Sequence, residues 1–195
     1  MNALDLRGFD LLYGGTHGAW NAWMIALTCA GGGWAVLALL PMMVWPRRPA
    51  LRSLTRALAA AIAAQALLVC VIKAATGRVR PWIALGLPAP IGAPHDGSFP
   101  SGHAAGSFCV ASFLIIALPA LCPTTPWRTR TLSVLVFILA AMIGVSRVSL
   151  GAHFPRDVLA GSLLGAVVGT AAGRIYLGFY WQPFLSRLEA PTESS

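Results

Sequence analysis

Long apolar runs separated by short polar segments dominate the chain, and their lengths predict membrane-spanning helices. A helix needs about 20 mostly apolar residues to cross the hydrocarbon core of a bilayer. Runs of about this length cover residues 20–44, 54–75, 102–121, 132–150 and 155–180. Segments rich in Pro, Gly or Arg separate the runs. We therefore expect an all-α integral membrane bundle with five spans.

The first 18 residues have a different pattern, because charged residues alternate there with apolar ones. Asp5, Arg7 and Asp10 lie among four leucines and a phenylalanine. This pattern is typical of an amphipathic helix that lies in the membrane interface. We expect residues 1–18 to form such a segment, which makes six helices in all, and residues 184–195 to form a polar tail. Residues 1–195 are expected to be a single domain.

Composition supports the membrane assignment and excludes one class of partner. Charged residues make up 10% of the chain, whereas about 25% is usual in soluble proteins. The formal net charge is +8, but the arginines are scattered between apolar runs and form no basic face of the kind that binds nucleic acid. We expect membrane lipids as partners and no nucleic acid.

Alternation of the five spans places four polar segments on one side of the membrane. These segments are Lys73 to Pro81, Pro100 to His103, Ser146-Arg147 and His153 to Asp157. Lys73, Arg80 and Arg147 belong to these polar segments and are assigned to a candidate site. When they are left out of the count, the other side of the membrane carries the excess of arginine: Arg47, Arg48, Arg52, Arg56, Arg128, Arg130 and Arg187. Cytoplasmic loops carry the excess of basic residues. We expect a multi-pass protein of the cell (inner) membrane with its polar site on the extracytoplasmic, periplasmic side.

The residue types on that side point to phosphate chemistry. Two histidines, one carboxylate and three cations gather at one membrane face, and ionisable residues in membrane proteins mark functional sites. His153 and Asp157 are four residues apart, so in a helix the carboxylate can reach the imidazole. Gly161, Gly165, Gly169 and Gly173 continue the same row, and small residues at this spacing indicate a face packed against another helix. No set of metal ligands is apparent, and we expect neither metal nor cofactor.

Three motifs match a known family at every position. Lys73 to Pro81 reads K-x6-R-P, Pro100 to His103 reads P-S-G-H, and Ser146 to Asp157 reads S-R-x5-H-x3-D. Together they resemble the signature of the type 2 phosphatidic acid phosphatase family. Membrane members of that family commonly have six spans, against five expected here.

The resemblance implies a metal-independent phosphatase that works through a phosphohistidine. His153 would be the nucleophile, oriented by Asp157, and His103 would protonate the leaving oxygen. The phosphoryl oxygens would be held by Lys73, Arg80, Ser101, Gly102 and Arg147. A lipid substrate fits a site at the membrane face, and small bacterial-type members often act on polyprenyl diphosphates such as undecaprenyl diphosphate.

Other functions stay open at this point. Phosphatidylglycerol phosphate, phosphatidic acid or lipid A are alternative substrates, and a lipid phosphotransferase would carry the same motifs. A small anion-binding transporter is a non-enzyme alternative, although its ionisable residues should be distributed through the depth of the bilayer. Two residues near the motifs are interpreted as peripheral: Arg78 as a head-group contact and Asp96 as part of a solvated turn.

Overall fold

The computed structural model describes residues 3–15, 18–32, 49–90, 95–121 and 126–181, and every regular element in these ranges is a helix. Four helices of the described part are long and apolar enough to cross a membrane. They are α5 (Pro49–Thr76), α7 (Gly102–Leu121), α8 (Pro126–Ser149) and α9 (Pro155–Tyr176). The all-α fold and four of the five expected spans are confirmed. The remaining expected span, 20–44, lies partly outside the described residues, and α2 (Ala19–Ala30) covers its start.

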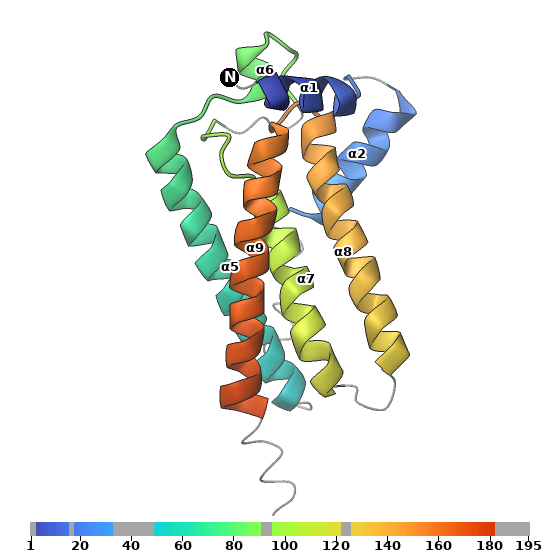
Figure 1. The fold of residues 1–195 in the computed structure, drawn as a ribbon, viewed down its shortest axis with the longest axis vertical. Helices are drawn as coiled ribbons and strands as arrows, with labels where there is room; N and C mark the ends of the chain where they lie inside the picture. Colours follow the sequence, from blue (N-terminus) through green and yellow to red (C-terminus); the bar gives the residue numbers. More distant parts are fainter. Residues whose placement is uncertain (1–2, 16–17, 33–48, 91–94, 122–125, 182–195) are drawn as a thin grey trace, which may run out of the picture.

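The four long helices run side by side along the long axis of the molecule (Figure 1). Helix α9 lies against α7 along its glycine row, and all four glycines are buried. A Cβ atom at Gly161, Gly165 or Gly169 would collide with backbone atoms of α7 or of Ser101 just before it. The missing side chains therefore permit a backbone-to-backbone approach that larger residues would prevent. The prediction that this face of α9 points inward is confirmed.

Helix α1 (Ala3–Leu12) lies across one end of the bundle, roughly perpendicular to the spans (Figure 1). Its inner face buries Phe9 against Val148 and Phe154. Its outer face exposes Leu4 and Leu11, at 69% and 85% of their surface. This two-sided character is that of the amphipathic interfacial helix expected from the sequence.

The end covered by α1 also gathers the polar segments. Figure 1 shows the last turn of α5, the first turns of α7 and α9, the last turn of α8 and the short helix α6 (Pro81–Ala84) together there. Residues that are far apart in the sequence thus meet at one end of the bundle, as the alternation of spans predicted.

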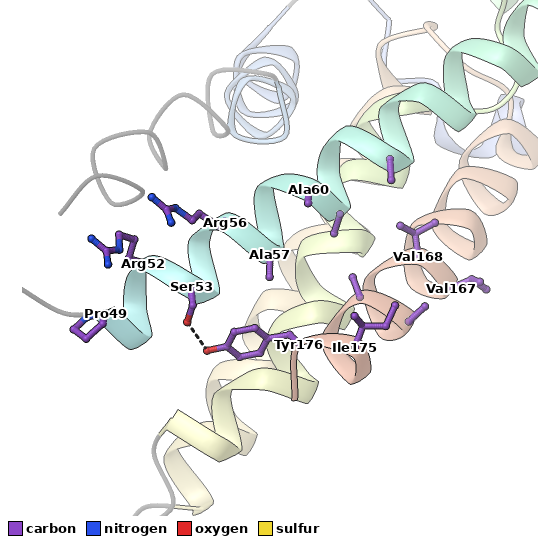
Figure 2. Close-up of a pocket in the computed structure, with 14 residues that line it drawn as sticks. Pro49, Arg52, Ser53, Arg56, Ala57, Ala60, Val167, Val168, Ile175 and Tyr176 are labelled. Atoms are coloured by element: carbon purple, nitrogen blue, oxygen red, sulfur yellow. Dashed lines mark hydrogen bonds between the residues drawn. The ribbon is translucent and has the colours of Figure 1, made fainter. Parts of the chain in front are cut away.

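The opposite end contains a separate apolar groove between α5 and α9 (Figure 2). Its volume is about 710 Å³, and alanines and valines such as Ala57, Ala60 and Val168 line most of it. The hydroxyls of Ser53 and Tyr176 share a hydrogen bond of 3.4 Å that joins the two helices. This groove contains neither histidine nor carboxylate, so the candidate chemistry lies at the α1 end.

Candidate active site

A cavity of about 360 Å³ at the α1 end brings together most of the residues predicted from the motifs. Its lining includes six of them: Lys73, Arg80, Gly102, His103, Arg147 and His153. Lys73 comes from the last turn of α5 and Arg147 from the last turn of α8. Arg80 directly precedes α6. The site is therefore assembled from helix ends that the glycine-mediated packing of α9 on α7 holds in register.

His153 is buried in the loop before α9, with 2% of its surface exposed. Its Nδ1 lies 2.7 Å from the carbonyl oxygen of Ser98, and its Nε2 lies 3.2 Å from Nη1 of Arg80. A guanidinium can only donate and a carbonyl can only accept. Nδ1 therefore carries the proton, and Nε2 carries the lone pair, which accepts from Arg80 at the edge of the cavity that both residues line.

The electrostatic surroundings keep this imidazole neutral. Burial lowers the pKa of His153 from 6.5 to about 4; Arg147 and Arg80 act in the same direction, and Asp157 opposes them. Desolvation and neighbouring cations both disfavour the charged form. At neutral pH Nε2 is therefore unprotonated and keeps the lone pair that a nucleophile needs.

Asp157 lies within ion-pair distance of His153, as their spacing predicted, but the two side chains are not hydrogen-bonded. Its Oδ2 lies 3.8 Å from Nδ1 of His153, which is too long for a hydrogen bond. The reason is that His153 precedes the helix: Phe154 is the N-cap, and Asp157 reaches back to accept a 2.9 Å bond from the Phe154 N–H. Side chains four residues apart lie on the same face when both residues are inside a helix. His153 lies before the first helical residue, so the spacing alone does not give a hydrogen bond here.

Ser98 connects the two residues instead. Its carbonyl accepts from His153, and its hydroxyl donates to Oδ2 of Asp157 at 2.6 Å. Ser98 has none of its surface exposed. The hydrogen-bonded connection between His153 and Asp157 thus runs through Ser98, a residue that sequence reasoning did not identify. The orienting role of Asp157 stays a prediction.

The cations Lys73 and Arg80 share one carboxylate, that of Asp96. Lys73 Nζ lies 2.8 Å from Oδ2 and Arg80 Nη2 lies 2.6 Å from Oδ1. Burial raises the pKa of Asp96, but the hydrogen bonds from Lys73 and Arg80 outweigh it and leave the pKa lowered. Asp96 lies at an exposed bend, as the interpretation of a solvated turn expected, but its contacts to Lys73 and Arg80 were not predicted. A two-oxygen anion bridges two of the three cations expected to hold a phosphate.

Arg147 borders two cavities. It is 7% exposed, and its Nη1 donates to the Thr28 hydroxyl of α2 at 3.1 Å. Its Nε is buried and has no hydrogen-bond partner among the described residues. Besides the main cavity, Arg147 lines a neighbouring one of about 310 Å³ with Thr28 and Pro88. Arg147 thus lies between the two cavities, and its buried Nε is unpaired within the described part of the chain.

Ser101 and Gly102 differ in their placement. Gly102 lines the main cavity, whereas Ser101 is fully buried outside its lining. The Ser101 hydroxyl lies 3.5 Å from the Ala104 N–H, in the position of a helix N-cap. His103 lies in the first turn of α7 and faces the cavity. A phosphate-binding role for the Ser101 hydroxyl stays a prediction.

Sequence reasoning also misplaced Arg78 and overlooked Asp5. Arg78 was interpreted as a head-group contact, but its Nη1 lies 2.5 Å from Asp157 Oδ1 and its Nη2 lies 2.6 Å from Asp5 Oδ2. Asp5 has 1% of its surface exposed. One signal was available: Asp5 and Phe9 are four residues apart and so share the inner face of α1.

Comparison with known families identifies the family of this chain. The PAP2 superfamily model matches residues 54–181, a range that begins in α5 and includes all three motifs. The chain belongs to the PAP2 superfamily, and its long apolar helices make it a multi-span membrane member.

Individual relatives are phosphatases of lipid-linked phosphates by name. Decaprenylphosphoryl-5-phosphoribose phosphatase of Mycobacterium tuberculosis is 34% identical over 140 residues, which are 70% of this chain and 68% of that protein. Phosphatidylglycerophosphatase B of Bacillus subtilis is 39% identical over 75 residues, 36% of this chain; the match spans about a third (35%) of the relative's length.

A solved structure supports the fold along almost the whole chain. The transmembrane PAP2 type phosphatidylglycerolphosphate phosphatase from Bacillus subtilis superposes with a TM-score of 0.72 and 23% identity, covering 97% of this chain and 90% of the other. At this identity the likeness concerns the fold.

Proposed function

We propose that this protein is a membrane lipid phosphatase that transfers a phosphoryl group from a lipid to His153 and then to water. The observation that carries the proposal is the state of His153. Its imidazole is neutral with Nε2 unprotonated, and it lines a cavity that Lys73, Arg80 and Arg147 also line. A nucleophile within a cluster of cations suits an anionic phosphorus centre.

The first step forms a phosphohistidine. Nε2 of His153 attacks the terminal phosphorus, and the bond breaks between that phosphorus and the oxygen that links it to the rest of the lipid, which in a diphosphate is the bridging oxygen. His103, which lines the same cavity, donates a proton to the leaving lipid oxygen as general acid. Asp157, 3.8 Å from Nδ1, stabilises the positive charge that develops on the imidazole.

The second step restores the enzyme. His103, now neutral, accepts a proton from a water molecule, whose oxygen attacks the phosphohistidine. The bond from nitrogen to phosphorus breaks, and inorganic phosphate leaves. We propose that the reaction is metal-independent, because two guanidinium groups and an ammonium group already supply three positive charges for the phosphoryl oxygens.

A lipid substrate is supported by an apolar extension of the site. A space of about 140 Å³ adjoins the main cavity and shares with it Gly31, Gly32, Ile62 and Gly106. Its other lining residues include Val110, Val136 and Leu139. A head group in the cationic cavity would therefore have apolar space beside it for the first part of its chain.

Among lipids, we favour a polyprenyl diphosphate such as undecaprenyl diphosphate. Two observations support this choice: Arg147 borders a second cavity of about 310 Å³ next to the first, which gives room for a second phosphate, and one relative is named for a decaprenyl-linked substrate. Phosphatidylglycerol phosphate, phosphatidic acid and lipid A are the alternatives. We place the site on the extracytoplasmic side, from the arginine excess at the other end.

The test is phosphate release by detergent-purified protein in the presence of EDTA. The panel holds undecaprenyl diphosphate, phosphatidylglycerol phosphate, phosphatidic acid and lipid A, each with wild type and His153→Ala. We expect release in EDTA, preference for the diphosphate, and none with His153→Ala. Activity that chelation removes and metal restores would reject metal independence, and equal rates on glycerolipids would reject the substrate preference. Transfer to an added lipid acceptor, without release, would identify a phosphotransferase.

A further inference from the structure

The carboxylate next to the candidate nucleophile is tied to the N-terminal helix by one arginine. The two Nη atoms of Arg78 contact different carboxylates: Nη1 lies 2.5 Å from Asp157 Oδ1, and Nη2 lies 2.6 Å from Asp5 Oδ2. Asp5 and Asp157 are 1% and 0% exposed. Helix α1, which lies outside the three motifs and outside the matched range 54–181, is therefore connected to Asp157 through the guanidinium of Arg78.

Further contacts fix this arrangement. The second oxygen of Asp5 accepts a 3.1 Å hydrogen bond from the N–H of Arg156 in the first turn of α9. The Arg78 guanidinium lies over the ring of Phe154, 4.8 Å from its centroid, and Phe9 packs against the same ring. Both oxygens of Asp5 thus have donors, and the plane of the guanidinium is set from two directions.

The remaining contacts of Asp157 explain why the plane of Arg78 matters. Oδ1 of Asp157 accepts from Arg78, and Oδ2 accepts from Ser98 and from the Phe154 N–H. If Arg78 lost its bond to Asp5, its guanidinium would be free to rotate. It could then compete with the present donors for Oδ2 of Asp157. Asp157 would then shift relative to the imidazole that it stabilises from 3.8 Å.

Stability alone is a weak reason for such a cluster. Removing charged groups from water is costly, and well-packed apolar residues at buried ion-pair positions are often as stable or more so. The planar guanidinium of Arg78, by contrast, holds the two carboxylates at fixed positions relative to each other, which a flexible lysine ammonium does not do.

We propose that Asp5 is a positioning residue for the active site and acts through Arg78 on Asp157. Helix α1 is thereby part of the catalytic unit in addition to its place at the membrane interface. This inference rests on the proposed function, since it assigns to Asp5 an effect on the reaction at His153.

The experiment is a double-mutant cycle on phosphate release, with kcat and KM measured separately. Asp5→Asn keeps the shape of the side chain and removes its charge. We expect it to lower kcat by about tenfold, as loss of a charged hydrogen bond does, and to leave KM within about twofold. In the Asp157→Asn background the same change should alter kcat by less than about twofold, because coupled residues are not additive.

Asp10→Asn is the matched control, since Asp10 is an exposed acid on the same helix. It should leave kcat and KM at wild-type values. Equal losses from Asp5→Asn in both backgrounds would show a general structural effect and overturn the proposal, as would a wild-type kcat. Thermal unfolding in detergent checks that each variant is folded.

Arg78→Lys provides a second route should Asp5→Asn prove unstable. This variant keeps the positive charge but lacks the planar guanidinium, and we expect kcat to fall by about tenfold with KM little changed. A wild-type kcat would overturn the inference. Failure of the proposed function is distinguishable. In that case His153→Ala and Asp157→Asn would also release phosphate at wild-type rates, whereas failure of this inference leaves those two variants impaired.

Discussion

The imidazole of His153 and the backbone of Ser98 are joined by a 2.7 Å contact from Nδ1 to the carbonyl oxygen. Because the carbonyl accepts, this bond fixes the proton on Nδ1 and leaves Nε2 as the nucleophilic atom. The hydroxyl of Ser98 also binds Asp157, at 2.6 Å. One serine in the loop before α7 therefore sets the tautomer of the nucleophile and holds the carboxylate that accompanies it.

Ser98→Ala tests this double role. The backbone carbonyl remains, but Asp157 loses one donor, so we expect kcat to fall by about tenfold with KM little changed, in line with a lost bond to a charged group. Steady-state kinetics of phosphate release measure the effect. Ser133→Ala is the control, because Ser133 is also buried and bonds to the Thr129 carbonyl, on α8 and away from the site. Equal kcat values for the two variants would contradict the role of Ser98.

The acid limb of the pH profile tests the state of His153. Protonation of Nε2 would remove the nucleophile, so kcat/KM falls as pH falls through the pKa, which burial lowers to about 4. We expect the profile, after correction for the substrate's own phosphate ionisation near pH 6, to stay level down to about pH 5. A corrected half-maximum near pH 6.5, the ordinary value for histidine, would contradict the buried neutral imidazole.

Asp96→Asn tests whether this carboxylate competes with phosphate for Lys73 and Arg80. The substitution removes the negative charge, while the bond from Arg80 Nε to the Asp96 carbonyl is retained. We expect inhibition by vanadate or inorganic phosphate to tighten by about threefold, a size typical of a partly exposed ion pair. Weaker inhibition would mean that Asp96 holds the cations in place for the phosphate and does not compete with it.

Gly165→Ala tests the packing that aligns the helix ends. The added Cβ would collide with the Ala105 carbonyl of α7, and overpacking of this kind costs about 1–3 kcal/mol. We expect a lower unfolding temperature in detergent, together with reduced activity. Gly178→Ala, where no atom lies within 4 Å of the added Cβ, should change neither; equal unfolding temperatures for the two variants would reject the close α7–α9 contact.

The starts of the helices were predictable from the sequence where the apolar run and the residues that favour a helix N-terminus coincide. Helix α7 begins at Gly102 and α9 at Pro155, as expected. Helices α5 and α8 begin earlier than their apolar runs, at Pro49 and Pro126. Proline favours the first helical position and arginine is a good helix former, so the charged first turns remain helical although hydropathy excludes them.

The site residues that belong to the three motifs were predictable from the sequence. The residues that contact them from segments far away in the sequence were not. The convergence of Lys73, His103 and His153 followed from counting spans. The contacts of Ser98 and Asp5 depend on how α1, the loop before α7 and the start of α9 meet in space. No local spacing encodes these contacts. The spacing of His153 and Asp157 correctly predicted that the two side chains lie close together, but not the 3.8 Å separation that accompanies the helix cap between them.

The central claim is the covalent intermediate on His153. The most direct measurement is to mix the protein with lipid substrate carrying a radiolabelled terminal phosphate, to quench in base, and to locate the label by peptide mapping. We predict base-stable, acid-labile label on the peptide with His153, none with His153→Ala, and longer-lived label with His103→Ala. Release of phosphate by wild type without any labelled protein, or label that persists in His153→Ala, would contradict the mechanism.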